Sequence, residues 1–303
     1  MHAAGGSGII EGAAAIGAAA GDCKGVLDCG ARKEGGLVSH GVAPLVPEPV
    51  SAGPACRPAG HGKADLHIHS TYSDGIDSIP KILDYVEHRT DLDIIAIADH
   101  DDVRGAHEAR ELAARRGYRV QVIMGTEITT RQGHLLALFV ERDFPMLKSL
   151  RASVDLVYEA GGLVIAPHPL CKLTASIQEK ALLAVQASPA PFHGLETFNP
   201  SVAGRVSHTA VAALNARLGL PEFGGSDAHA LSMIGLGYTY FPGATIADLR
   251  AALAAHTLIA GGRFMTFRDH AVIAAPNMWR SMVVSPAYKV QRAVRRSVRR
   301  AAS

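Results

Sequence analysis

The sequence predicts an α/β fold in which a barrel of strands carries a polar site at the carboxyl ends of its strands. Short apolar runs alternate with amphipathic stretches from Lys63 onward, which is typical of repeated strand–helix units. Histidines and carboxylates recur where these runs end, and the carboxyl ends of parallel barrel strands meet at one face. The 303 residues, 48% of them apolar, are sufficient for one large hydrophobic core.

Composition divides the chain into three parts. Residues 1–62 are rich in Ala, Gly and Pro, which predicts a flexible leader because few large apolar groups offset the entropy of ordering. Residues 63–265 contain the alternating pattern and form the predicted barrel. Residues 266–303 form a basic tail, which suits either a solvated extension or an amphipathic helix that contacts nucleic acid or an anionic membrane.

Charge and cysteine content limit the class of protein. The net charge is +2 and aromatic residues make up 5% of the chain, so no nucleic-acid-binding surface dominates the total. The four cysteines include no C-x-x-C pair, which indicates a reducing compartment without a disulfide framework. No apolar run reaches the roughly 18 residues of a transmembrane segment, and the N-terminus lacks a secretory signal pattern. A globular, cytoplasmic protein is predicted.

The elements of the barrel follow one another in a regular order. A strand over 64–69 leads to a helix that starts with Ser78 as N-cap and Pro80 in its first turn. The run 94–98 is fully apolar and bounded by charges, as expected of a buried parallel strand. The later elements are a helix over 105–116, a strand over 120–124, an apolar run over 135–140, a helix over 145–160, a strand over 163–166, helices over 175–187 and 203–218, a strand over 237–241, a helix over 246–256 and a last strand near 258–259.

The pair His67 and His69 is the first candidate for metal binding. Side chains alternate along a strand, so both imidazoles leave the same face and can hold one metal ion. Two strand histidines without a metal are an equally good interpretation of this pair taken alone. A polar turn follows and brings Asp74, whose carboxylate can serve a second ion.

Further residues of the same types occur after the later strands. The candidate metal ligands are His67, His69, Asp74, His100, Glu127, His134, His168, Asp227 and His229. Imidazole and carboxylate without thiolate suit Mn, Zn or Fe. The set exceeds one coordination sphere, so two to three divalent metal ions are expected. Ions about 4 Å apart stabilise both the attacking and the leaving oxygen in phosphoryl transfer.

Five ordered motifs resemble those of the PHP (polymerase and histidinol phosphatase) family. They are D-L-H-I-H-S-x-x-S-D-G at 65–75, A-D-H-D at 98–101, G-x-E at 125–127, A-P-H-P at 166–169 and G-S-D-A-H at 225–229. The resemblance covers roughly residues 63–265. It implies a distorted (βα)7, TIM-like barrel with a trinuclear centre of Mn, Zn or Fe that hydrolyses phosphoesters.

The resemblance also implies how the ligands divide among three ions. The first ion would take His67, His69, Glu127 and Asp227; the second would share Glu127 and add His134 and His168; the third would take Asp74, His100 and His229. For His134, contact with a substrate phosphate or simple packing is the alternative. Asp99 is expected to orient a ligating imidazole, because ligating histidines usually donate their other N–H to a carboxylate.

The predicted activity is that of a metal-dependent phosphoesterase, a phosphoric ester hydrolase. A metal-activated hydroxide would attack a phosphomonoester or phosphodiester, with Glu127, His134 and Asp227 acting through the ions. The substrate would be a nucleotide, an oligonucleotide or a small phosphorylated metabolite. Candidate substrate contacts are Asn199, Arg205, Arg104 and Arg131, and a surface or loop role without substrate contact is the alternative for each.

Two other functions remain open at this point. An amidohydrolase-type metal hydrolase also begins its barrel with H-x-H, but it requires a bridging lysine after a middle strand and leaves Asp99, His100 and His229 unexplained. A non-catalytic PHP-like structural or regulatory domain is the third interpretation, which the complete ligand set disfavours. Two to three bound metal equivalents would favour the phosphoesterase, and none would favour the non-catalytic domain.

Overall fold

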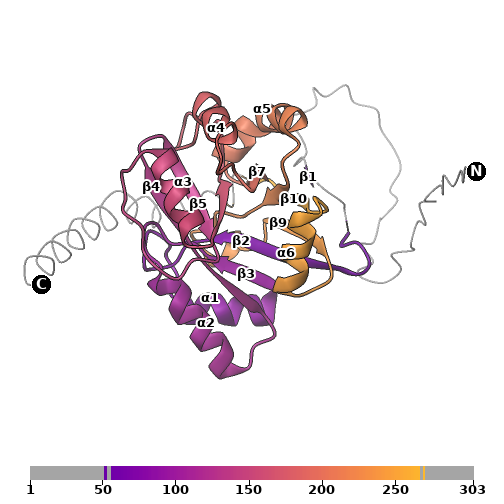
Figure 1. The fold of residues 1–303 in the computed structure, drawn as a ribbon. Coiled ribbons are helices and arrows are strands. Elements are labelled where there is room, and N and C mark those ends of the chain that lie inside the picture. The colour runs from indigo at the N-terminus through magenta and orange to yellow at the C-terminus, as the bar shows by residue number, and fades with distance from the viewer. Residues whose placement is uncertain (1–50, 53–55, 267–268, 270–303) are drawn as a thin grey trace, which may run out of the picture. The chain divides into compact units, whose positions relative to one another are not determined.

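The described residues form a nearly closed, barrel-shaped sheet with helices on its outer surface, as predicted from the sequence (Figure 1). The structure is a computed structural model that describes residues 51–52, 56–266 and 269. The chain divides into two units, residues 1–46 and 47–303, and the described residues belong to the second. Most of the predicted leader and nearly all of the predicted basic tail therefore lie outside the described residues.

The strands follow the order β1-β10-β9-β2-β3-β4-β5-β6-β7-β8 across the sheet. Their bounds are Ser51–Ala52 (β1), His61–Ile68 (β2), Ile94–Ile97 (β3), Gln121–Thr130 (β4), Gly133–Leu138 (β5), Leu163–Ala166 (β6), Gly194–Phe198 (β7), Glu222–Gly224 (β8), Gly237–Pro242 (β9) and Ile259–Arg263 (β10). Parallel pairing joins β2, β3 and β4, and also β6, β7 and β8. The strand β5 is antiparallel to both of its neighbours, and β9 is antiparallel to β2 and β10.

The antiparallel strands are where the sheet departs from a regular barrel of parallel strands. Strand β4 continues past the predicted end to Thr130 and turns directly into β5. The hydroxyl of Thr130 donates to the carbonyl of Gly133, whose φ of 129° suits glycine. As a result, β5 begins at the end of the barrel where the parallel strands finish. Strand β1 and the first residues of β2 also pair in the sheet, although they fall within the range assigned to the leader.

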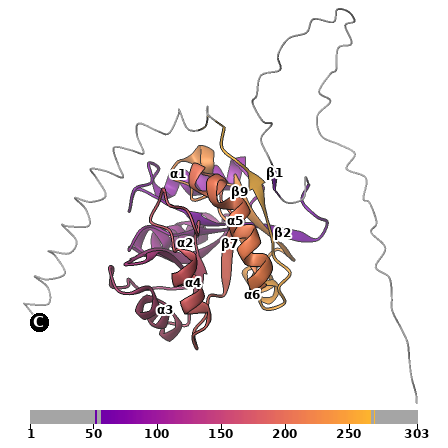
Figure 2. The same cartoon turned by 90° about the horizontal axis from the view of Figure 1, so that it is seen from above.

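Helices pack on the outside of the sheet (Figure 2). Their bounds are Ile79–Arg89 (α1), Arg104–Arg116 (α2), Leu150–Glu159 (α3), Glu179–Gln186 (α4), Val202–Leu218 (α5) and Ile246–Ala254 (α6), with a 3₁₀ turn at Leu231–Met233. Helix α3 begins later than predicted because the hydroxyl of Ser149 accepts from the N–H of Ala152 and caps it there. Within the described part of the chain, none of the helices combines the length and hydropathy needed to cross a lipid bilayer.

An apolar cluster fills the barrel beside the polar end. It includes Leu136 and Leu138 of β5, and His134 lies on the same face of that strand. It also includes Ile123 of β4, which shares its face with Glu127. Two further clusters lie between the sheet and the outer helices. Each of these strands therefore presents apolar residues to the core and a polar residue to the barrel end.

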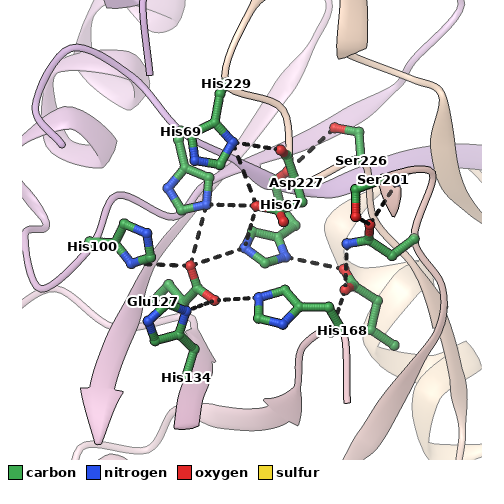
Figure 3. A network of polar contacts seen from close by, with 12 residues as sticks. His67, His69, His100, Glu127, His134, His168, Ser201, Ser226, Asp227 and His229 are labelled. Atoms are coloured by element: carbon green, nitrogen blue, oxygen red, sulfur yellow. Dashed lines mark hydrogen bonds and ion pairs between the residues drawn. The ribbon is translucent and has the colours of Figure 1, made fainter. Parts of the chain in front are cut away.

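A β-bulge in β2 directs two histidines into the barrel. The pairing of β2 with β3 shifts register between Asp65 and Ile68. Leu66 belongs to the interior cluster, whereas Ile68 packs in the cluster under α1, so strict alternation is broken between them. His67 and His69 then both point toward the polar end of the barrel (Figure 3).

The barrel closes between β8 and β9 through a side chain. The hydroxyl of Thr239 accepts from the backbone N–H of Gly224 and donates to its carbonyl, both at 2.9 Å. A Cβ at Gly224 would overlap the carbonyl oxygen of Tyr238, so glycine is required here. We call this contact between Gly224 and Thr239 the seam of the barrel.

Thr239→Val is expected to lower the free energy of unfolding by about 2 to 6 kcal/mol. Valine has a similar shape but leaves the N–H and the carbonyl of Gly224 without their partner, and each unsatisfied buried group costs roughly 1–3 kcal/mol. Chemical denaturation measures the change, and Thr257→Val at an exposed position is the control. Equal stability of Thr239→Val and the parent protein would contradict the role of the seam.

Candidate metal centre

The side chain of Glu127 lies at the centre of a cluster of histidines at the polar end of the barrel (Figure 3). Its carboxylate is fully buried, and both oxygens face imidazole nitrogens. Oε2 lies 3.4 Å from Nε2 of His67, 3.4 Å from Nε2 of His69 and 3.2 Å from Nδ1 of His100, and Oε1 lies 3.1 Å from Nδ1 of His134 and 3.0 Å from Nε2 of His168. One carboxylate therefore contacts imidazoles from several separate strand ends.

Two aspartates supply further carboxylate oxygens to the cluster. Oδ1 of Asp227 lies 3.1 Å from Nε2 of His69. Oδ1 of Asp74 lies 3.2 Å from Nε2 of His229, and its Oδ2 lies 3.6 Å from Nε2 of His100. All the candidate ligands predicted from the sequence therefore converge on one region.

The donor atoms of the described residues fall into three overlapping groups. The groups are His67, His69, Glu127 and Asp227; His69, Asp74, His100 and His229; and His100, Glu127 and His134. Within each group the donor atoms lie within 4.8 Å of one another. Any two groups share one residue, which is His69, Glu127 or His100. Such sharing is expected where neighbouring ions use common ligands.

The predicted division of ligands among ions agrees with this grouping in part. The set predicted for the first ion coincides with the first group, and the set predicted for the third ion is joined by His69. For the second ion, His100 lies beside Glu127 and His134, whereas His168 contacts Glu127 but falls outside the three groups. The assignment of each ligand to an ion stays a prediction.

Strand direction explains why residues so far apart in the sequence meet. His100 follows the parallel strand β3, and His168 follows β6. His134 instead stands at the start of β5, which runs the opposite way and so begins at the same barrel end. Ala228 pairs with Ile68 of β2 and carries the neighbouring loop to this end. Both strand directions therefore deliver ligands to one face.

The backbone is strained at two of the candidate ligands. His168 has φ of 27° and Asp227 has φ of 50°, in the left-handed region that non-glycine residues rarely adopt. Each such residue costs roughly 1–3 kcal/mol and persists only where its surroundings impose it. Both side chains point into the cluster (Figure 3), so the strained turns coincide with the placement of polar groups.

Hydrogen bonds fix the protons of three imidazoles. Nδ1 of His67 lies 3.1 Å from Oε1 of Glu196, a carboxylate that can only accept. Nδ1 of His168 lies 3.0 Å from the hydroxyl of Ser176, whose own proton goes to the carbonyl of His168 at 2.7 Å. Nδ1 of His229 faces a backbone carbonyl at 2.8 Å. In each ring Nδ1 is the donor, which leaves Nε2 directed toward a carboxylate.

In the cluster, imidazole nitrogens face carboxylate oxygens with no hydrogen bond between them, an arrangement that suits a metal centre. Among the described residues, Nε2 of His67, Nε2 of His69 and Oε2 of Glu127 are buried without a hydrogen-bond partner. Buried polar atoms are nearly always paired, so these atoms require a proton or a cation between them. Imidazole nitrogen and carboxylate oxygen are both ligands of divalent transition metals. The residues present therefore fit the predicted ions.

The electrostatics of the cluster keep its carboxylates ionised. Burial opposes the ionisation of Glu127, but the surrounding imidazoles, His134 foremost, hold its pKa well below the usual range. Burial also opposes protonation of His229, yet the carboxylate of Asp74 raises its pKa to about 10. Burial lowers the pKa of His100 to about 3. Ionised carboxylates and a neutral His100 are the states that bind a metal ion, whereas an ion held by His229 would displace the proton from its Nε2.

The structure corrects the predicted role of Asp99. Its carboxylate accepts from the backbone N–H of Ser70 at 2.7 Å, from the Ser70 hydroxyl at 2.7 Å and from the Ser73 hydroxyl at 2.6 Å. These bonds fix the loop between His69 and Asp74 instead of a ligating imidazole. The expectation that Asp99 orients an imidazole is wrong because none of the described histidines donates a ring N–H to its carboxylate, and the imidazole of its neighbour His100 points to Glu127.

Glu196 makes the contact with an imidazole N–H that was expected of Asp99, although it is not among the predicted site residues. It lies between Leu195 and Thr197 in β7, whose residues are all buried, and it contacts His67. A carboxylate inside a fully buried strand is the signal that could have identified it, because such a charge is rarely buried without a partner.

The four predicted substrate contacts lie after strands that end at the same barrel face, and each has another partner. Asn199 is buried, donates to Glu196 and accepts from Ser201. The three arginines have exposed or part-exposed side chains: Arg104 pairs with Asp102 at 2.8 Å, Nε of Arg131 donates to the carbonyl of Leu147 at 2.9 Å, and Arg205 stacks on Phe264. Contact of these residues with a substrate stays a prediction.

Comparison with known proteins gives two family matches whose ranges overlap at their ends. Residues 65–215 match the PHP domain, and residues 208–258 match the PHP-associated family. The uncharacterized protein MJ1587 of Methanocaldococcus jannaschii is 33% identical over 148 residues, which cover 45% of this chain and 81% of that protein. A phosphoribosyl 1,2-cyclic phosphate 1,2-diphosphodiesterase of Eggerthella lenta is 39% identical over 95 residues, which cover 29% of this chain and 35% of that enzyme. The match thus spans about a third of the length of this second relative.

A solved structure has the same fold. A two-domain protein of Bacteroides vulgatus, described as containing a predicted PHP-like metal-dependent phosphoesterase, superposes with a TM-score of 0.58 and 20% identity. The match covers 76% of this chain and 73% of that one. With its ordered motifs, its barrel and these matches, the chain belongs to the PHP domain family.

Proposed function

We propose that the chain is a metal-dependent phosphoesterase that hydrolyses a phosphomonoester or phosphodiester. The substrate would be a nucleotide, an oligonucleotide or a small phosphorylated metabolite. The observation that carries the proposal is the overlap of three donor groups through His69, His100 and Glu127. Neighbouring divalent ions suit phosphoryl transfer, and a relative named as a phosphodiesterase supports a phosphoester substrate.

The proposed centre takes two to three ions of Mn, Zn or Fe. Bound divalent ions supply a water of lowered pKa and neutralise charge on phosphoryl oxygens. The side chains of His67, His69 and Glu127 are inaccessible to solvent and form the floor of the site. The side chains of Asp227 and His134 are 18% and 17% exposed, so a phosphate would approach from their side. This arrangement supports the catalytic roles proposed for Glu127, His134 and Asp227.

The amidohydrolase alternative receives less support. It requires a bridging lysine after a middle strand, and the lysines that follow β5 and β6, Lys148 and Lys172, have exposed side chains. The residue shared by two of the donor groups is instead a carboxylate, Glu127. The non-catalytic alternative does not explain why the Nε2 atoms of His67 and His69 are buried without a hydrogen-bond partner.

A substrate panel tests the proposed function. Protein reconstituted with Mn, Zn or Fe should hydrolyse at least one of an aryl phosphate, an aryl phosphodiester, a set of nucleotides and a set of short oligonucleotides. His67→Ala should lose this activity while keeping its fold, which circular dichroism verifies. A folded parent protein that holds two to three metal equivalents and cleaves no member of the panel would overturn the proposal.

Arg131→Ala is expected to raise KM by about 10-fold with little change in kcat. The side chain stands in the turn between β4 and β5, close in sequence to His134, and a hydrogen bond to a charged group contributes roughly 1.5–3 kcal/mol. Steady-state kinetics on the best substrate of the panel measures the change. Arg110→Ala, which removes an exposed arginine paired with Glu141, is the control. An unchanged KM would show that Arg131 does not contact the substrate and that its side chain serves only the hydrogen bond to the carbonyl of Leu147.

A further inference from the structure

We infer that Glu196 is a positioning residue that prepares His67 and His168 for metal binding. The inference rests on the metal centre of the proposed function. Glu196 lies in β7 with 2% of its surface exposed, and it belongs to none of the three donor groups of the described residues. Its carboxylate is instead surrounded by hydrogen-bond donors from three separate segments.

The first effect of Glu196 is on the tautomer of His67. Oε1 of Glu196 lies 3.1 Å from Nδ1 of His67, and an ionised carboxylate has no proton to donate. The imidazole therefore carries a proton on Nδ1, and Nε2 is the nitrogen left to bind a cation. That Nε2 faces Oε2 of Glu127 at 3.4 Å and Oδ1 of Asp227 at 3.5 Å. Glu196 thus selects the tautomer in which His67 can bind a cation.

The second effect is on the backbone of His168. Oε2 of Glu196 accepts from the backbone N–H of His168 at 2.7 Å. This residue has the strained φ of 27°, and a short hydrogen bond from a buried carboxylate is one of the interactions that can hold it there. The imidazole then contacts Glu127 at 3.0 Å. One carboxylate therefore constrains two candidate ligands whose strands, β2 and β6, are separated by three others in the sheet.

The surroundings of Glu196 hold it in this orientation. Nδ2 of Asn199 donates to Oε2 of Glu196 at 3.0 Å, and Oδ1 of Asn199 accepts from the N–H of Ser201 at 3.0 Å and from its hydroxyl at 2.6 Å. The fixed amide therefore presents its N–H to the carboxylate. On the opposite side, a Cβ at Gly225 would overlap Oε1 of Glu196. The glycine before Ser226 and Asp227 leaves room for this carboxylate.

Glu196→Gln tests the inference because it replaces one carboxylate oxygen by an N–H₂ group and keeps the size of the side chain. Glutamine can keep an oxygen toward the N–H groups of His168 and Asn199, but it then places an N–H₂ group opposite Nδ1 of His67. That donor favours the tautomer with the proton on Nε2, which blocks Nε2 as a ligand. Mn²⁺ affinity, measured by calorimetric titration, should weaken by about 10- to 100-fold, the range typical of residues that orient metal ligands. The unfolding temperature of the chelator-treated protein should stay close to that of the parent.

A spectroscopic measurement separates positioning from a purely structural role. In Zn²⁺-loaded protein with ¹⁵N-labelled histidine, the parent should show a ring for His67 with the proton on Nδ1 and a coordinated Nε2. Glu196→Gln should lose that signal. Glu222→Gln makes the same chemical change at an exposed residue of the adjacent strand β8, and it should leave both Mn²⁺ affinity and the spectrum unchanged.

The outcomes distinguish this inference from the proposed function. Unchanged Mn²⁺ affinity in folded Glu196→Gln would overturn the inference. A loss of affinity in a protein whose parent hydrolyses no phosphoester would uphold it and overturn the proposed function instead. If Glu196→Gln does not fold, Asn199→Ala removes one donor to the same carboxylate and should weaken Mn²⁺ binding to a smaller extent; unchanged binding in that variant would also overturn the inference.

Discussion

Glu127→Gln is expected to reduce the bound metal to about one equivalent and to remove detectable hydrolysis. Glu127 belongs to two of the three donor groups, whereas the group of His69, Asp74, His100 and His229 does not include it. Residues that only orient ligands contribute roughly 10- to 100-fold to metal affinity, so loss of a shared ligand should exceed about 100-fold at the two affected groups. Elemental analysis after gel filtration measures the metal content.

Glutamine cannot reproduce the contacts that the two oxygens of Glu127 make. Both carboxylate oxygens face imidazole nitrogens, so one of them would become an N–H₂ group directed at His134 and His168 or at His67 and its neighbours. Glu222→Gln, at an exposed carboxylate, should keep the metal content of the parent. Full metal content in Glu127→Gln would show that the carboxylate is not a shared ligand.

Removal of metal by a chelator is expected to lower the unfolding temperature by about 5 to 10 °C. An ion present at 100 times its dissociation constant stabilises the folded state by about 2.7 kcal/mol. For a domain of this size, each kcal/mol corresponds to roughly 2–4 °C. The ion would also neutralise the opposed acceptors of His67, His69 and Glu127, so several bound ions should produce a larger shift. Differential scanning fluorimetry with and without the chelator measures the effect.

Excess Mn²⁺ added after dialysis should restore the unfolding temperature. The variant His67→Ala lacks one ligand of the first donor group and should respond less to the chelator than the parent. An unfolding temperature that is independent of chelator in protein shown to contain metal would contradict the expected link between metal binding and stability.

Much of the candidate site was predictable because the position of a residue after a strand and its chemical type can both be read from the sequence. Apolar runs locate the strands, and the polar residues that follow them converge at one barrel end whether or not the intervening loops are known. His100 and His168 follow strands in this way. The direction of β5 was not predictable, because a short apolar run such as 135–138 has the same pattern in either direction. The position of His134 depends on that direction.

The hydrogen bonds that hold the candidate ligands in place could not be predicted from sequence patterns. Asp99 stands next to His100 in the chain, yet its bonds go to Ser70 and Ser73 across a loop. Glu196 reaches His67 from a distant strand, and only the three-dimensional arrangement brings them together. The bulge in β2 likewise depends on pairing with β3 rather than on local composition.

The seam has a consequence for the order in which a newly synthesised chain can acquire metal. The loop after β8 joins β2 through the bonds of Ala228 with His67 and His69, so the first and last ligands of the chain meet beside the seam. Two of the three donor groups need Asp227 or His229, which leave the ribosome last. Only the group of His100, Glu127 and His134 is complete earlier. The proposed centre would therefore be complete only after β8 and β9, the strands of the seam, have been synthesised and paired.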